Sequence, residues 1–172
     1  ERHYTMENYV FLKKRLLKNL TSSEYAVLNF DDEIVVEFAK ESIAKKVFVS
    51  VKEKVDGAYM LSGKLYFKDK AIMDKEAIPI IGLHNVYNVL FAIATCMILG
   101  CDVESIKEGI MTFKGVPHRT EVILEKDGIT YVNDSKSTNT ASTIVAVNSL
   151  KNPAILILGG SEKGENYDKL FT

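Results

Sequence analysis

Apolar and polar residues follow the period of a helix in some segments and the period of a strand in others, which indicates an α/β fold. Residues 7–20 carry apolar positions at helical spacing. We therefore expect an amphipathic helix that packs its apolar side inward, with Thr5 as its N-cap. A strand at 25–30, a helix at 34–44 and a strand at 46–51 predict a parallel strand pair with a helical crossover.

The middle of the chain changes from short strands to long helices. Ser62-Gly63 is a hairpin signal, Pro79 restricts its strand to a sheet edge, and Gly100 is a natural helix end. The expected elements are a hairpin of 58–61 with 64–67, a strand at 76–80, a helix from Gly82 to Leu99 and a helix at 103–113.

A second domain begins near Pro117. Residues 114–117 place a glycine and a proline after a helix, so we expect domains at 1–114 and 115–172. The second should contain strands at 121–124 and 129–132, a helix at 141–150, and a strand at 154–158. That last strand is an unbroken apolar run, which is typical of a parallel strand buried on both faces. The turns around Asp134 and Lys163 should then face the same rim of the sheet.

Composition narrows the classes of function. The 172 residues are 47% hydrophobic and 26% charged with a net charge of −1, which gives no electrostatic drive toward nucleic acid. No apolar run is long enough for a membrane span, and no signal peptide is present. Cys96 and Cys101 fit no metal or redox spacing and are expected to be small core residues of a cytoplasmic protein. The chain starts at Glu1 without Met and is expected to be a segment of something longer.

The most informative run is Asn133-Asp134-Ser135-Lys136-Ser137-Thr138-Asn139. It lies between a strand pattern and a helix pattern, at the carboxyl end of a strand, where open α/β sheets bind ligands. Turn formation and helix capping alone would explain the Asp and Ser residues. They explain the added Lys and the Thr-Asn pair less well, so we expect a ligand site here.

Asn85 and Asn88 lie three residues apart, on one face of the first turns of a helix. A carboxamide offers a donor and an acceptor together, which suits the edge of a purine base. The alternative is that one Asn caps the helix and the other is a buried polar group bonded to a loop.

Arg119 lies at the expected domain boundary, where its planar guanidinium suits a phosphate. An interdomain salt bridge is an equally good interpretation. His118 beside it has no nucleophile nearby in sequence and favours a structural role.

Two lysines are candidates with plainer alternatives. Lys163 follows Gly159-Gly160 in a turn that can approach an anion, although a solvated surface lysine is the default. Lys13 is followed by two more cations, Lys14 and Arg15, whose like charges crowd it. A neutral amine reacts with carbon dioxide to give a carbamate that can ligate Mg²⁺. A solvated helix face is the plainer interpretation of Lys13-Lys14-Arg15.

Taken together, five spaced motifs resemble those of the Mur ligases, over essentially all of the chain. The motifs are Tyr9-(x)3-Lys13-x-Arg15, Gly82-x-His84-Asn85-x-x-Asn88, Pro117-His118-Arg119-x-Glu121, Asn133-Asp134-Ser135-Lys136-x-Thr138-Asn139 and Gly159-Gly160-x-x-Lys163. The resemblance implies a partial central domain followed by a partial Rossmann-like C-terminal domain, with ATP bound between them. It also implies that the phosphate loop, a metal-binding His and the end of the C-terminal domain lie outside these residues.

The resemblance further implies an ATP-dependent ligation through an acyl phosphate, in peptidoglycan biosynthesis. The run at 133–139 most resembles that of the family members that add D-glutamate to UDP-N-acetylmuramoyl-L-alanine, so the resemblance implies these substrates. We also expect a monomer without membrane insertion. By similarity, Lys13 would be a carbamate that ligates Mg²⁺, Asn85 and Asn88 would lie near the adenine, and Arg119 and Asp134 would contact phosphate and ribose. Lys136 and Thr138 would lie near the transferring phosphate and the incoming amino acid, and Lys163 would pair with the D-glutamate side chain.

Two other functions stay open at this stage. One is a non-catalytic nucleotide-binding or interaction fragment with inherited motifs, which is inactive alone. The other is a related ligase resembling folylpolyglutamate synthase, against which the run at 133–139 argues.

Overall fold

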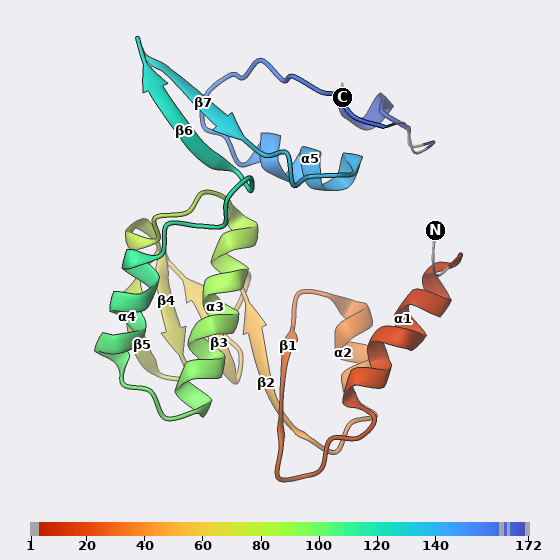
Figure 1. Cartoon of the computed structure of the whole chain (residues 1–172). Coiled ribbons are helices and arrows are strands. Elements are labelled where there is room, and N and C mark those ends of the chain that lie inside the picture. The colour runs from red at the N-terminus through yellow and green to blue at the C-terminus, as the bar shows by residue number, and fades with distance from the viewer. Residues whose placement is uncertain (1–3, 162–163, 165, 171–172) are drawn as a thin grey trace. The chain divides into compact units, whose positions relative to one another are not determined.

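The computed structural model describes residues 4–161, 164 and 166–170 (Figure 1). The chain forms two compact units. The first comprises Glu1–Ala77 and Val86–Ile110, and the second comprises Ile78–Asn85 and Met111–Thr172. Such units need not coincide with independently folding domains, so the domain division at residue 114 stays a prediction.

A five-stranded sheet organises the first unit. Its strands lie in the order β1-β2-β3-β4-β5, with β1–β2 and β2–β3 parallel and the remaining pairs antiparallel. The strands are β1 (Tyr25–Asn29), β2 (Lys45–Ser50), β3 (Gly57–Leu61), β4 (Lys64–Phe67) and β5 (Lys70–Asp74). Helix α2 (Glu33–Ala39) is the crossover between β1 and β2, and Asp32 caps it by accepting from two backbone amides. The predicted parallel pair with a helical crossover is confirmed.

The hairpin of β3 and β4 is also confirmed. Both turn residues have left-handed backbones, with φ of 50° at Ser62 and 75° at Gly63, as a two-residue hairpin turn requires. The strand predicted at 76–80 is wrong, because Lys75–Ala77 form a 3-10 helix and the last strand of this sheet is β5, which ends at Asp74. A register irregularity between β4 and β5 buries the consecutive Ile72 and Met73 and so removes the alternation that would have identified the strand.

Two helices follow the sheet, α3 (Leu83–Ile98) and α4 (Val103–Thr112), close to the expected bounds. The buried apolar residues of these two helices recur at helical spacing, as a core-facing stripe should. They are Val86, Val89, Leu90, Ile93 and Ala94 in α3, and Ile106 and Ile110 in α4. Gly100 follows the end of α3, and its φ of 82° makes it the expected left-handed C′ residue.

The first helix is shorter and more exposed than predicted. Helix α1 (Met6–Lys14) and a 3-10 turn (Arg15–Leu17) replace the expected single helix, and Thr5 caps α1 as predicted. The inward packing is wrong, since α1 buries no residue and Phe11 is 64% exposed. The small core of β1 and α2 is contacted from this region by Leu17 and Leu20, which lie beyond α1.

The second unit contains β6 (Glu121–Lys126) paired antiparallel with β7 (Ile129–Asn133), then α5 (Thr140–Asn148) and a 3-10 turn (Asp168–Leu170). The predicted strand at 154–158 is wrong. The segment has no regular structure, and Ile155 and Ile157 are 96% and 90% exposed. A parallel strand needs a neighbour to pair with, and β6 and β7 pair only with each other.

The two cysteines are free thiols, and Cys101 is exposed, which corrects the expectation that both lie in the core. Within the described part of the chain, every helix is too short or too polar to cross a membrane.

Candidate functional site

Two loops of the second unit form the centre of the candidate site. The first, Val116–Thr120, leads into β6, and the second, residues 133–139, runs from the end of β7 to the start of α5. Asn139 caps α5 by accepting from the amide of Ser142 at 2.8 Å. The polar run therefore occupies a strand-to-helix turn, as the sequence predicted.

The two loops are held together by hydrogen bonds. The Asp134 carboxylate accepts from the backbone amide of Thr120 at 2.8 Å and from its hydroxyl at 3.4 Å. The amide of Lys136 donates to the carbonyl of His118 at 3.0 Å, and the Asn133 side chain donates to Nδ1 of His118 at 2.9 Å. His118 thus has the structural role that its sequence context favoured.

These bonds hold an unusual backbone on either side of Arg119. His118 and Thr120 have φ values of 67° and 45°, in the left-handed region that non-glycine residues avoid. Such conformations cost energy and persist where surrounding contacts enforce them, often at ligand sites. The exposed Arg119 side chain is therefore presented from a fixed loop, and Asp134 is one of the groups that fix it.

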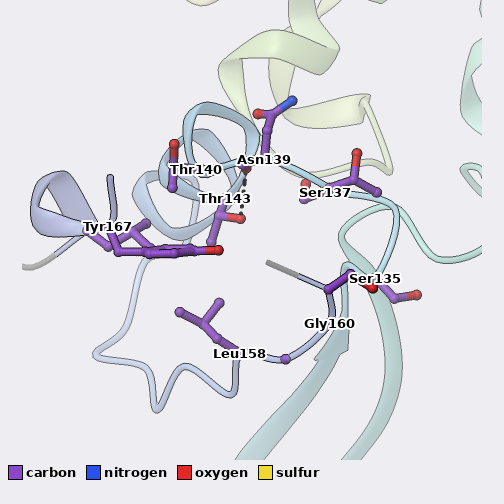
Figure 2. Close-up of a pocket in the computed structure, with 12 residues that line it drawn as sticks. Ser135, Ser137, Asn139, Thr140, Thr143, Leu158, Gly160 and Tyr167 are labelled. Carbon is purple, nitrogen blue, oxygen red and sulfur yellow. Dashed lines mark hydrogen bonds between the residues drawn. The ribbon is translucent and has the colours of Figure 1, made fainter. Parts of the chain in front are cut away.

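A pocket of about 330 Å³ lies beside the second loop (Figure 2). Hydroxyl, amide and backbone groups dominate its wall, and in Figure 2 the ring of Tyr167 lies near Thr143 and Leu158. The lining residues are Ser135, Ser137, Thr138, Asn139, Thr140, Thr143, Leu158, Gly159, Gly160, Ser161, Tyr167 and Leu170.

The pocket brings residues of the run at 133–139 together with Gly159, Gly160 and Ser161, which come shortly before Lys163 in the sequence. Thr138 lines it from the run, and Gly159 and Gly160 line it from the later segment. Lys163 lies outside the described residues, so its role stays a prediction. Such a wall can bind a small polar or anionic molecule through hydroxyl and amide donors.

His84 is a further polar group of this unit, and the sequence analysis gave it no role. Its Nδ1 is buried and has no hydrogen-bond partner among the described residues. Burial, followed by the positive charge of Arg119, lowers the pKa of His84, while Asp134 opposes the shift. The ring is therefore neutral at pH 7. Its place in the Gly82-x-His84-Asn85 motif was the only available signal.

The two asparagines differ in their environments. Asn85 is buried, and its side-chain amide donates to the carbonyl of Ile81 at 2.7 Å, so part of its hydrogen-bonding capacity serves the local chain. Asn88 is exposed on α3. Contacts of either residue with a base stay predictions.

Lys13 belongs to the first unit and is exposed on α1. Its Nζ lies 5.4 Å from the centre of the Tyr9 ring, and the adjacent Lys14 pairs with Glu41. In the described ranges, no three His, Cys, Asp or Glu side chains gather in a group that could hold a metal ion. The role of Lys13 as a metal ligand stays a prediction.

The sequence analysis missed a carboxylate network at the carboxyl ends of β1 and β2. Asp31 accepts from the hydroxyls of Tyr87 at 2.5 Å and Ser50 at 2.7 Å, and from the amide of Val51 at 2.9 Å. Burial alone would raise the pKa of Asp31, but these hydrogen bonds hold it below its usual value. Burial and the bond to Asp31 raise the pKa of Tyr87. The partners are up to 56 residues apart, so no local pattern reveals them.

Comparisons with known proteins identify the family to which the chain is similar. Residues 1–96 match the family of the Mur ligase middle domain. A UDP-N-acetylmuramoylalanine--D-glutamate ligase of Clostridioides difficile (strain 630) is 42% identical over 174 residues, covering 99% of this chain and 39% of that protein. The ligase of the same name from Caldanaerobacter subterraneus subsp. tengcongensis is 42% identical over 171 residues, covering 98% of this chain and 38% of that protein. The chain thus spans less than half the length of these curated relatives.

Solved structures share the fold. A crystal structure of MurF from Acinetobacter baumannii matches this structure with a TM-score of 0.71 at 18% identity. The match covers 86% of this chain and 34% of the MurF chain. A UDP-N-acetylmuramoyl-L-alanyl-D-glutamate--2,6-diaminopimelate ligase has a TM-score of 0.66 at 22% identity and covers 87% of this chain and 32% of its own. The expected α/β fold of a partial Mur ligase is confirmed. Since the middle-domain family covers 96 of the 172 residues, the chain belongs to the Mur ligase family.

Proposed function

We propose that this chain forms part of an ATP-dependent ligase that adds D-glutamate to UDP-N-acetylmuramoyl-L-alanine in peptidoglycan biosynthesis. The observation that carries the proposal is 42% identity, over 99% of the chain, to a ligase named for this pair of substrates. The hydrogen-bonded loops at Arg119 and Asp134 support it, because they hold a cation and a carboxylate in a fixed loop, as binding of a charged nucleotide requires.

The reaction proceeds in two steps. The substrate carboxylate takes the γ-phosphoryl group of ATP to give an acyl phosphate and ADP. The amine of D-glutamate then attacks the acyl carbon, forms the amide bond and releases phosphate. Charge neutralisation and positioning dominate phosphoryl transfer, so cationic side chains carry most of the protein's contribution.

The second unit supplies groups for the nucleotide and for the transferring phosphate. Arg119 binds phosphate oxygens through its planar fork. Asp134 contacts the ribose and also keeps the Arg119 loop in its left-handed conformation. Lys136 neutralises the transferring phosphate, and its own amide is fixed by His118.

The polar pocket receives the incoming amino acid. Thr138 lines it and donates a hydrogen bond to a D-glutamate carboxylate, and Lys163 pairs with the side-chain carboxylate. The described residues of the pocket wall are all uncharged. The preference for an acidic amino acid therefore comes from Lys163, whose positive charge attracts the side-chain carboxylate.

The first unit contributes to the adenine and to Mg²⁺. Asn88 of the first unit and Asn85 of the second bind the edge of the base. Lys13, as a carbamate, would contribute a carboxylate-like ligand to Mg²⁺. Bound Mg²⁺ neutralises phosphate charge. The ligase acts as a monomer in the cytoplasm, where ATP is available.

A chimera tests the proposal. The matched segment of the Clostridioides difficile ligase is replaced by these 172 residues, and incorporation of D-[14C]glutamate into UDP-N-acetylmuramoyl-L-alanine is measured. We expect ATP-dependent incorporation. Lys136→Ala should lower kcat by about 10²–10³-fold, as loss of a group that stabilises transition-state charge does. Lys151→Ala, which removes an exposed lysine from the same unit, should leave kcat unchanged.

The outcomes separate the substrate from the reaction class. A folded chimera that hydrolyses or uses no ATP would overturn the ligase proposal and favour a non-catalytic fragment. A chimera that ligates another amino acid in preference to D-glutamate would keep the reaction class and refute the assigned substrate. Unchanged kcat in Lys136→Ala would refute the role of that lysine alone.

A further inference from the structure

The C-terminal end of α3 brings the chain's two cysteines together. The amide of Cys101 donates to the carbonyl of Cys96 at 3.0 Å, and the amide of Gly100 donates to that of Met97 at 3.2 Å. With Gly100 in the left-handed region, this pair of bonds defines a Schellman motif. Cys96 and Cys101 occupy its C3 and C″ positions, whose side chains ordinarily touch in an apolar contact.

The thiols interact with each other in this arrangement. Burial, followed by the charge and hydrogen bond of Cys101, raises the pKa of the Cys96 thiol. Cys96 is half-buried and Cys101 is exposed. The two sites therefore differ in access, although the helix end holds them as neighbours.

We propose that Cys96 and Cys101 form a dithiol site that reacts as a pair with low-molecular-weight disulfides and closes to an intramolecular disulfide. The backbone bonds of the Schellman motif hold Cys96 and Cys101 as neighbours, so their thiols are brought close by the folded helix end. Because the chain has only two cysteines, no other internal pairing competes. The site is independent of the proposed ligase function.

The order of events follows from exposure. The Cys101 thiolate attacks one sulfur of glutathione disulfide, the S–S bond breaks, and one glutathione thiolate leaves. The Cys96 thiol then loses its proton to solvent, and its thiolate attacks Sγ of Cys101 in the mixed disulfide. The second glutathione leaves, so two electrons have passed from the pair to glutathione disulfide and two glutathione thiols have formed.

Mass spectrometry of the 172-residue chain tests the proposal. After incubation with glutathione disulfide and alkylation with iodoacetamide, the native chain should lose two hydrogen atoms and take up no alkyl group. Cys96→Ser should accumulate one glutathione on Cys101, because the resolving thiol is absent. Cys101→Ser should react about tenfold more slowly, because the remaining thiol is half-buried.

Disulfide closure in the native chain is compared with closure in the urea-unfolded chain. The comparison shows whether the folded Schellman motif, rather than the short separation of the two cysteines in sequence, favours closure. The equilibrium constant for closure should be about tenfold larger in buffer than in urea, and Gly100→Ala should reduce that advantage. Gly109→Ala is the matched control. An added Cβ meets no atom within 4 Å at either glycine, but only Gly100 has a left-handed φ, of +82°. Equal constants in buffer and urea would overturn the proposal. So would stable double glutathionylation of the native chain, disulfide-linked dimers, or no reaction.

Discussion

Tyr87→Phe gives the most direct measure of the Asp31 network, because it deletes one hydroxyl and keeps the ring. That hydroxyl donates to Oδ2 of Asp31 at 2.5 Å. Hydrogen bonds to charged groups contribute about 1.5–3 kcal/mol. Oδ2 keeps its bond from the amide of Val51, so the loss should lie at the low end. We expect the free energy of unfolding to fall by about 1.5 kcal/mol.

Urea unfolding followed by circular dichroism measures this change. Tyr25→Phe is the control, because Tyr25 is an exposed tyrosine whose ring contacts Lys45, and its effect should stay within about 0.5 kcal/mol. A double-mutant cycle with Asp31→Asn should give a coupling energy of about 1–2 kcal/mol. A loss no larger than that of Tyr25→Phe, with no coupling to Asp31, would refute the view that this contact holds α3 to the strand ends.

The same contact has a signature at high pH. The pKa of Tyr87 is raised in the folded chain, so above a pH of about 10 the unfolded chain releases a proton that the folded chain keeps. Stability of the native chain should therefore fall as the pH rises above that value. In Tyr87→Phe this contribution disappears, and the difference in stability between the two proteins should shrink with pH.

Three further predictions concern Gly82, His84 and Asp134 of the second unit. Gly82→Ala should lower the free energy of unfolding, measured in urea, by more than about 2 kcal/mol, because φ is +103° and the new Cβ would lie 2.6 Å from the His84 ring. The control Gly109→Ala in α4 should instead raise it by up to about 1 kcal/mol. His84 has a lowered pKa, so acidification below about pH 6.5 protonates the unfolded chain first and destabilises the fold, and His84→Gln should flatten the melting temperature between pH 7.5 and 5.5. Asp134→Ala should speed hydrogen exchange at the Thr120 amide by about tenfold, since a bond of about 1.4 kcal/mol is lost there; unchanged exchange would show that Asp134 does not fix the loop.

The parts of the fold that the sequence predicted correctly are those fixed by local chemistry. Ser62-Gly63 supplies the two left-handed residues of a hairpin, and Gly100 supplies the helix end. The crossover from β1 to β2 combines two apolar strands with a capped helix. Each of these signals is contained within a few residues.

The misses depended on partners elsewhere in the chain. Strand β5 has no clear alternation because its pairing with β4 is irregular, and residues 154–158 lack a neighbouring strand. For the site, the polar run at 133–139 could be predicted from its position between a strand pattern and a helix pattern. It did not reveal that Asp134 bonds Thr120, or that Asp31 bonds Tyr87, since both contacts join distant residues.

The bare apolar segment at 154–158 has a practical consequence for the isolated chain. Its backbone groups are not engaged in a sheet, and its isoleucines face water. An exposed, apolar and uncharged stretch of this kind is a template for strand addition by a second copy. Solubility during purification should therefore depend on protein concentration, and a lysine in place of Ile155 or Ile157 should relieve aggregation.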